Sequence, residues 1–251
     1  MNFDISHLLE SWEYKAGQVS VRRFHGKDGQ EKIQLRVDLG IMQMNADGRP
    51  DGKRPFGFPS LLEYYQDRLE KYRAEHGGND EGFVLDVEDC ARLQMEALQY
   101  HHRYICFLQL EDYDRVIRDT ERNLEMMDFV DEYAESDELA WNVQMLRPQL
   151  IMMRSRAWAT LLMQGGLYDE AITLVQNEIE YLRDFYEVMG REEMAEESPE
   201  IFSLEAWLED IRERRPLSKR EALEVALAEA LRKENFEEAA KLRDALRELK
   251  E

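Results

Sequence analysis

The chain contains few cysteines and prolines and no long apolar segment. Its 251 residues include two cysteines, Cys90 and Cys106, and six prolines. The two cysteines lie sixteen residues apart in one expected helix, too far to bridge, which is typical of a reducing compartment. The longest uncharged run, residues 157–168, is much shorter than the ~18 apolar residues that cross a bilayer. The first residues lack the basic and apolar regions of a signal peptide, so we expect a cytoplasmic protein that binds no membrane.

The sequence also lacks the short motifs that identify common enzymes and cofactor sites. It contains no G-x-x-x-x-G-K-[ST], G-x-S-x-G, H-E-x-x-H or G-x-G-x-x-G pattern. His102 and Cys106 lie at i, i+4 on one expected helix, a spacing that can hold a metal. No third ligand is evident, however, and a packed core pair is the favoured explanation of the two side chains. We therefore expect a protein without enzyme activity, cofactor or metal.

Positive charge is scarce outside one segment. The chain has 33 Lys and Arg against 54 Asp and Glu, a net charge of −21 that disfavours nucleic acids and anionic membranes. Residues 12–59 are the exception, because nine basic and six acidic residues give them a net charge of +3. This N-terminal lobe either docks electrostatically on the acidic remainder or binds an anion or nucleic acid. In the second case a Gly-rich loop would present Arg49, Lys53 and Arg54 to phosphate.

Residues 1–59 predict a short helix, a β-hairpin and a loop. Apolar residues from Ile5 to Trp12 follow helical spacing. Residues 19–24 and the strictly alternating residues 33–41, separated by turn residues, predict a two-stranded hairpin. The apolar pattern changes parity after Gly40, which we interpret as a β-bulge. A loop rich in glycine and proline follows to residue 59.

Residues 60–190 predict a helical body that contains an internal repeat. Tyr113-Asp114 aligns with Tyr168-Asp169 at an offset of 55 residues, and each copy predicts a helix, a tight turn and a returning helix. Leu124 and Met127 then align with apolar residues of the second copy. Ser60 and Asp86 are expected helix caps, and Pro148 should kink or restart a helix. The first repeat helix is expected to turn one apolar stripe to the core: Ala91, Met95, Leu98, His102, Ile105 and Leu108.

The turn of the second copy suggests a family for this body. Gly166-x-Tyr168-x-x-Ala171 is similar to the turn between the helices of tetratricopeptide repeats. The offset of 55 residues is longer than the ~34 residues typical of that family, and no proline closes the unit. The resemblance implies a concave docking surface for another protein. A generic pair of helical hairpins remains the alternative.

Residues 191–216 predict an acidic linker with a short helix, and residues 217–251 predict a final helical hairpin. Ser218 and Glu221 form the pattern of a capping box, and Asn235 separates the two helices. The stretch Phe236-Glu237-Glu238-Ala239-Ala240-Lys241-Leu242-Arg243-Asp244 resembles the FE-x-AA-x-LRD core of the UVR domain, a short motif of bacterial DNA-repair proteins. The remaining residues contain neither the ATPase nor the nuclease motifs of those proteins.

The UVR resemblance implies a protein-contact module that pairs with similar hairpins. The partner would be another protein with a UVR-like hairpin, or a second copy of this chain; alternatively, the hairpin docks on its own body. The expected contact residues are Leu223, Leu227, Leu231, Phe236, Ala239, Ala240, Leu242, Arg243, Leu246 and Leu249. We therefore expect a mostly α protein that acts as a non-enzymatic adaptor, with a nucleic-acid accessory factor that uses the N-terminal lobe as the alternative.

Overall fold

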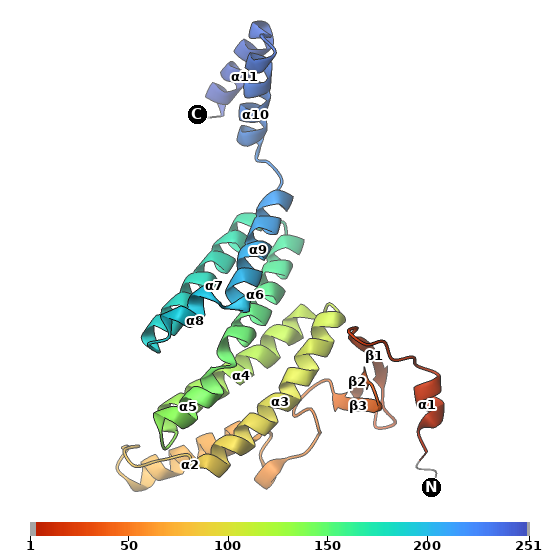
Figure 1. Cartoon of the computed structure of the whole chain (residues 1–251), viewed down its shortest axis with the longest axis vertical. Helices are drawn as coiled ribbons and strands as arrows, with labels where there is room; N and C mark the ends of the chain where they lie inside the picture. Colours follow the sequence, from red (N-terminus) through yellow and green to blue (C-terminus); the bar gives the residue numbers. More distant parts are fainter. Residues whose placement is uncertain (1–3, 250–251) are drawn as a thin grey trace. The chain divides into compact units, whose positions relative to one another are not determined.

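Helices form most of the structure, as the sequence predicts (Figure 1). The computed structural model describes residues 4–249, and the chain divides into two compact units, Met1–Leu208 and Glu209–Glu251. A small antiparallel sheet lies in the N-terminal lobe, which is defined as residues 1–59 from here on. The mostly α fold with N-terminal β structure is therefore confirmed.

The sheet of the N-terminal lobe has three strands and not two. Its elements are α1 (Ser6–Glu10), β1 (Ser20–His25), β2 (Glu31–Val37), β3 (Gly40–Asn45) and the 3-10 turn η1 (Pro55–Gly57). The β1–β2 hairpin is confirmed, but the parity change after Gly40 is no bulge, because Val37 pairs with Gly40 and the chain reverses between them into β3. Leu39 continues the apolar alternation although its side chain is 89% exposed at this turn. Periodicity alone therefore could not mark the reversal.

The helices begin and end close to the positions that local signals predict. The first unit contains α2 (Leu61–Glu75), α3 (Val87–Gln109), α4 (Tyr113–Tyr133), α5 (Asp137–Gln144), α6 (Arg147–Gln164), α7 (Tyr168–Val188), α8 (Glu192–Glu196) and most of α9 (Pro199–Arg214). Ser60 Oγ accepts a hydrogen bond from the N–H of Glu63 (3.2 Å), and the Asp86 carboxylate accepts one from that of Asp89 (2.8 Å). Pro148 stands in the first turn of α6, so it restarts the helix.

The internal repeat extends to the backbone of its turns. Helices α3, α4, α6 and α7 lie side by side in chain order (Figure 1). Glu111 (φ 56°) and Gly166 (φ 77°), 55 residues apart, both adopt the left-handed conformation that ends a helix. In both turns the next N–H donates to the carbonyl five residues before it, at 2.9 Å, from Asp112 to Phe107 and from Leu167 to Leu162. Two hairpins of the same design therefore form a helical repeat.

The apolar stripe expected to face the core on α3 lies on the outside of the helix. Met95 is 64% exposed and Leu98 is 44% exposed, whereas Leu93 on the opposite face is fully buried. The buried face also carries Glu96 and Arg103, which hydropathy assigns to solvent. Both charges are buried because each is paired with an opposite charge. The prediction of the buried face from apolar residues alone was therefore wrong.

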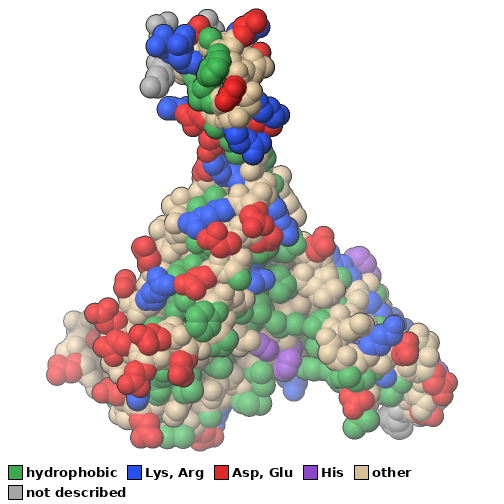
Figure 2. Space-filling model, turned by 45° about the horizontal axis from the view of Figure 1, so that its top comes forward, with side chains coloured by type: hydrophobic (Ala, Val, Ile, Leu, Met, Phe, Trp, Pro, Cys, Tyr) green, Lys and Arg blue, Asp and Glu red, His purple; other side chains and the backbone are tan. Residues whose placement is uncertain are grey.

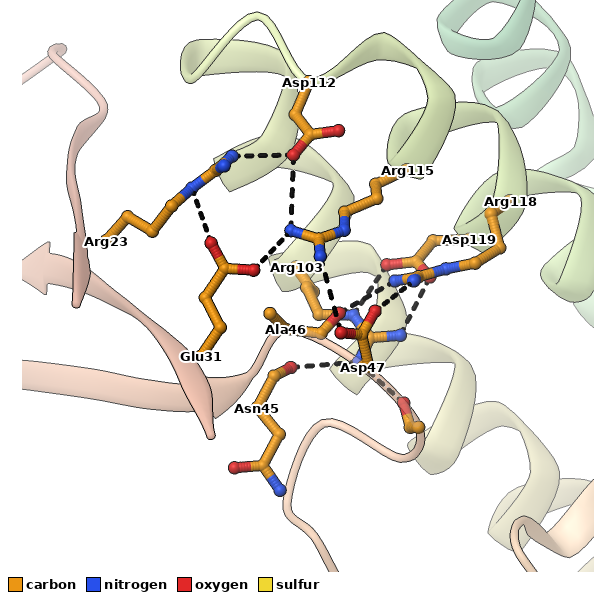
Figure 3. A network of polar contacts seen from close by, with 11 residues as sticks. Arg23, Glu31, Asn45, Ala46, Asp47, Arg103, Asp112, Arg115, Arg118 and Asp119 are labelled. Carbon is orange, nitrogen blue, oxygen red and sulfur yellow. Dashed lines mark hydrogen bonds and ion pairs between the residues drawn. The ribbon is translucent and has the colours of Figure 1, made fainter. Parts of the chain in front are cut away.

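A buried arginine joins the N-terminal lobe to the helices (Figure 3). The Arg103 guanidinium on α3 donates to the Asp119 carboxylate on α4 through Nε (2.7 Å) and Nη2 (2.8 Å). Its Nη1 donates to the carbonyls of Asn45 (3.0 Å) and Gly48 (2.6 Å) in the lobe. Both charged side chains are 1% exposed. One side chain thus connects two helices and the chain segment that follows β3.

Further ion pairs surround this buried one and cross the boundary in both directions (Figure 3). Arg23 of β1 lies 2.7 Å from the Asp112 carboxylate at the start of α4. In the opposite direction, Arg115 of α4 pairs with Glu31 of β2 (2.7 Å) and Arg118 pairs with Asp47 (2.7 Å). The lobe therefore docks by reciprocal pairing, in which arginines of the acidic body also bind carboxylates of the basic lobe.

The orientation of α3 predicts different costs for the same substitution on its two faces. Leu93→Ala should lower the free energy of unfolding by about 2–5 kcal/mol, because it leaves a cavity in the core. Leu98→Ala should cost less than about 1 kcal/mol, because the side chain is already partly in water. Urea denaturation of both variants measures the difference. Equal costs would show that α3 is rotated relative to the structure described.

The buried ion pair predicts a large loss of stability when one partner is removed. Arg103→Met should lower the free energy of unfolding by about 3–5 kcal/mol, because Asp119 would remain buried without a counter-ion. Arg212→Met is the control, since it removes an exposed pair with Glu209 that contributes at most about 1 kcal/mol. Denaturation curves followed by circular dichroism compare the two. A cost for Arg103→Met no larger than that of the control would exclude this role.

Candidate protein-binding surfaces

Of the three basic residues predicted to bind an anion, Arg49 is already paired with carboxylates and the other two are exposed. The Arg49 guanidinium is held by two carboxylates, with Nε 2.7 Å from Glu96 and Nη1 2.7 Å from Asp51. Lys53 and Arg54 are exposed on the loop, and Arg54 Nε donates to the carbonyl of Gly57 (3.4 Å). An anion at this loop would therefore meet two exposed cations and one arginine that is already neutralised.

Arg49 instead belongs to a buried cluster centred on Glu96. The Glu96 carboxylate of α3 accepts from Arg49, from Arg122 of α4 and from the backbone N–H of Leu61 (2.9 Å) at the first residue of α2. A carboxylate at this position also interacts favourably with the positive end of the α2 dipole. Sequence reasoning missed Glu96, because no local pattern distinguishes it from the many solvated carboxylates.

Two hollows flank the exposed apolar stripe of α3. One has a volume of about 520 Å³ and is lined by residues that include Met42, Leu61 and His102. The other has a volume of about 400 Å³ between α3, α4 and α6, and no Asp, Glu, Lys or Arg side chain lines it. Met95 and Leu98 line both hollows, so we call the continuous surface the α3 groove. Figure 2 shows histidine side chains beside hydrophobic ones in the middle of the body.

The two hollows of the α3 groove differ in charge, because Arg49, Glu88, Arg92 and Glu96 line the first, whereas the second has histidine and uncharged polar groups. His101 Nδ1 lies 2.6 Å from the hydroxyl of Tyr104, a side chain that is itself buried. Burial, and then the neighbouring His102, lower the pKa of His101; burial also lowers the pKa of His102. The hollow between α3, α4 and α6, which has apolar walls and no Asp, Glu, Lys or Arg side chain, is suited to the apolar side chains of another protein.

The hairpin of the second unit buries very little of its own apolar surface. It consists of α10 (Lys219–Arg232) and α11 (Phe236–Glu248). In the described part of these two helices, the buried side chains are Ala230 and Ala239, where the helices approach each other. Leu231 (52%) and Phe236 (69%) are exposed at the turn.

The other expected contact residues are distributed along both helices of the hairpin, from Leu223 near the start of α10 to Leu249 after the end of α11. Arg243 is exposed and pairs with its neighbour Asp244 (2.9 Å). The remaining ones are half-buried, apart from Leu249, which is 41% exposed: Leu223, Leu227, Ala240, Leu242, Leu246 and Leu249. Hydrophobic side chains therefore stand open between charged ones on this unit (Figure 2). The hairpin presents an apolar face that α10 and α11 do not cover for each other.

The turn of this hairpin repeats the design of the two turns in the body. Glu234 adopts the left-handed conformation (φ 55°), and the N–H of Asn235 donates to the carbonyl of Ala230 (2.8 Å). An aromatic residue, Phe236, then begins the returning helix, and the small residue Ala239 is buried three positions later. Tyr113 with Val116 and Tyr168 with Ala171 occupy the same places in the body. Sequence reasoning missed this third copy because its spacing differs from 55 residues and glutamate stands where Gly166 does.

The described residues form neither a cluster of metal ligands nor a helix that could span a membrane. Residues 4–249 contain no group of three or more His, Cys, Asp and Glu side chains arranged to hold a metal ion. Cys106 is fully buried, and burial raises the pKa of its thiol to about 12. In the same part of the chain no helix is both long and apolar enough to cross a bilayer.

The capping box of α10 predicts an unusually acidic carboxyl group. The backbone N–H of Ser218 donates to Glu221 (2.8 Å), and Arg215 pairs with the same carboxylate. These two partners, in that order, lower the pKa of Glu221 from its ordinary 4.5 to about 2. Since the folded pKa is depressed, the cap stabilises the helix fully above pH 4.5 and is lost as the pH falls through 2.

A ¹³C NMR titration of the Glu221 carboxyl group in the intact chain measures this shift. Arg215→Gln removes the second-largest cause, so the pKa of Glu221 should rise in that variant but stay below 4.5. A Glu221 that titrates at 4.5 in the unaltered protein would contradict the capping box.

Comparisons with protein-family models, with curated proteins and with solved structures gave no match to this chain. The α3 groove and the open face of the C-terminal hairpin are therefore defined by the residues of this chain alone.

Proposed function

We propose that this chain is a non-enzymatic adaptor of the cytoplasm that recruits another protein through its C-terminal hairpin, residues 217–251. The observation that carries the proposal is that Ala230 and Ala239 are the side chains buried within the described helices of the hairpin, while Leu231 and Phe236 remain exposed. The resemblance of residues 236–244 to the UVR core supports a role in protein contact.

The energetics of so small a hairpin favour a partner. A module of fewer than ~40 residues buries too little surface to be stable by itself. Covering one leucine or phenylalanine side chain completely contributes about 1.5–3 kcal/mol, and several stand open on this face. A second pair of helices laid across the turn would cover them together. The partner that fits best is therefore another UVR-like hairpin.

The charge of the hairpin permits that partner to be a second copy. Residues 217–251 contain eight basic and nine acidic residues, whereas the whole chain has a net charge of −21. Two hairpins can therefore approach without the repulsion that opposes contact between two acidic bodies. The α3 groove would serve as a second docking surface, as the tetratricopeptide-like repeat implies.

Two aspartates placed on the open face should abolish recruitment. Leu231→Asp with Phe236→Asp puts charge on exposed side chains of the apolar face, so capture of a partner should fall at least about tenfold while helical content is retained. The matched control is Ala222→Asp with Val225→Asp, which adds the same charge at exposed positions of α10 that are rotated by roughly 120° or more from Leu231 around the helix. Affinity capture and circular dichroism of both variants provide the two readouts.

A chain that ends at Pro216 tests the module as a whole. A protein captured by the full chain and the control, but not by the truncated chain or the open-face variant, would identify the hairpin as the recruiting module. Light scattering separates the two kinds of partner, because a second copy doubles the mass of the purified protein. The proposal would be refuted if the full chain, the control, the open-face variant and the truncated chain all captured the same proteins and all had the same oligomeric state.

A further inference from the structure

A second feature of the first unit, independent of the hairpin, concerns Arg156 in the middle of α6. Its side chain lines a hollow of about 350 Å³ between the α3–α4 turn, α6 and α9. The walls combine apolar and polar groups, from Leu108, Gln109, Tyr113, Thr160 and Trp207. The hollow is distinct from the α3 groove, with which it shares no lining residue.

The Arg156 guanidinium is held in place without a counter-ion. Its Nη2 donates to the hydroxyl (2.9 Å) and the carbonyl (3.3 Å) of Ser203 on α9, and its central carbon lies 5.5 Å from the centre of the Trp207 ring. Its Nε is buried and has no hydrogen-bond partner. No carboxylate of residues 4–249 lies within 4.0 Å of it. Burial lowers the pKa of Arg156.

Two other arginines of the first unit bury an unpartnered Nε, but both differ from Arg156. Arg122 and Arg154 also bury an Nε without a partner, but each pairs with a carboxylate through another nitrogen, that of Glu96 and that of Glu178. A chain with 54 acidic residues has ample carboxylates to place beside Arg156. A partly buried positive charge that is fixed and not neutralised is expected to bind an anion.

We propose that this hollow binds a single carboxylate group carried on a short apolar stem. The carboxylate would accept hydrogen bonds from Nη1 of Arg156, because Nε is buried and Nη2 already donates to Ser203, and the stem would lie against Leu108 and Trp207. The Tyr113 hydroxyl and the Gln109 amide on the wall are further donors, whereas the Thr160 hydroxyl already donates to the Arg156 carbonyl (2.6 Å).

The surroundings of the hollow select against ligands of higher charge. Glu111 lies on the same wall, and the chain as a whole has a net charge of −21. Both disfavour phosphates and polyanions relative to a monoanion. The carboxylate can come from a small organic acid or from a peptide, either as its C-terminus or as an acidic side chain.

The test uses 3-phenylpropionate as the probe and its neutral amide, 3-phenylpropanamide, as the matched ligand. Saturation-transfer NMR at low chloride concentration should detect binding of the acid at millimolar concentration and much weaker binding of the amide. Arg156→Gln should weaken binding of the acid about tenfold or more, because it removes a charge-assisted pair. Arg191→Gln is the control, because Arg191 is an exposed arginine without an ion pair, 5.5 Å from the centre of the Trp141 ring.

Further variants and ligands separate the alternatives. Arg156→Lys keeps the charge without the planar fork and should bind the acid with intermediate affinity, so the proposal can be tested even if Arg156→Gln does not fold. Acetylated peptides with a free C-terminus, and amidated ones with an internal glutamate, distinguish the two peptide sources from the free acid. Absence of binding to the unaltered chain by the acid and by both peptides would overturn the proposal. Equal binding of acid and amide, or equal affinity in all variants, would do the same.

Discussion

The ion pair between Arg103 and Asp119 determines which surfaces of the helical body are free. Because both side chains are almost completely buried, the faces of α3 and α4 that carry them must turn toward each other and toward the N-terminal lobe. The two backbone carbonyls that Arg103 binds fix the segment after β3 at the same place. The opposite face of α3, with Met95 and Leu98, is left outside and becomes the floor of the α3 groove. The buried ion pair between Arg103 and Asp119 thus leaves the apolar face of α3 exposed.

The same constraint explains how a chain with so few basic residues uses them. Arg49, Arg115 and Arg118 all bind carboxylates at the boundary between lobe and helices, where each holds two or more segments together. These arginines are already paired with carboxylates, although the composition of the lobe alone suggested a basic patch. The surfaces that we propose for partners are the α3 groove and the C-terminal hairpin, where exposed apolar side chains lie. Arg156 differs from these arginines, because its buried Nε has no hydrogen-bond partner and no carboxylate of the described residues pairs with its guanidinium.

Local signals in the sequence predicted where the helices and strands lie. Contacts between distant segments determine which of their faces are buried and which are exposed. Caps such as Asp86, the restart at Pro148 and the 55-residue repeat depend on neighbours along the chain, so they could be found from the sequence. The reversal at Leu39 could not, because its apolar side chain continues the strand pattern. Nor could the buried face of α3, which contains Glu96 because residues from three other segments neutralise or cap it. The candidate binding surfaces depend on these contacts between distant segments.

The three helical turns of the same design differ in how their first aromatic residue is covered. Tyr113 and Tyr168 begin α4 and α7 and are half-buried, because other helices of the first unit stand beside each turn. Phe236 begins α11 in the same backbone setting but is 69% exposed. In a repeat array the neighbouring unit covers the apolar side of each turn, and a terminal unit without a polar outer face leaves that side open. Phe236 and Leu231 therefore mark the place where the next helix of such an array would lie, and a helical pair from a partner can occupy it.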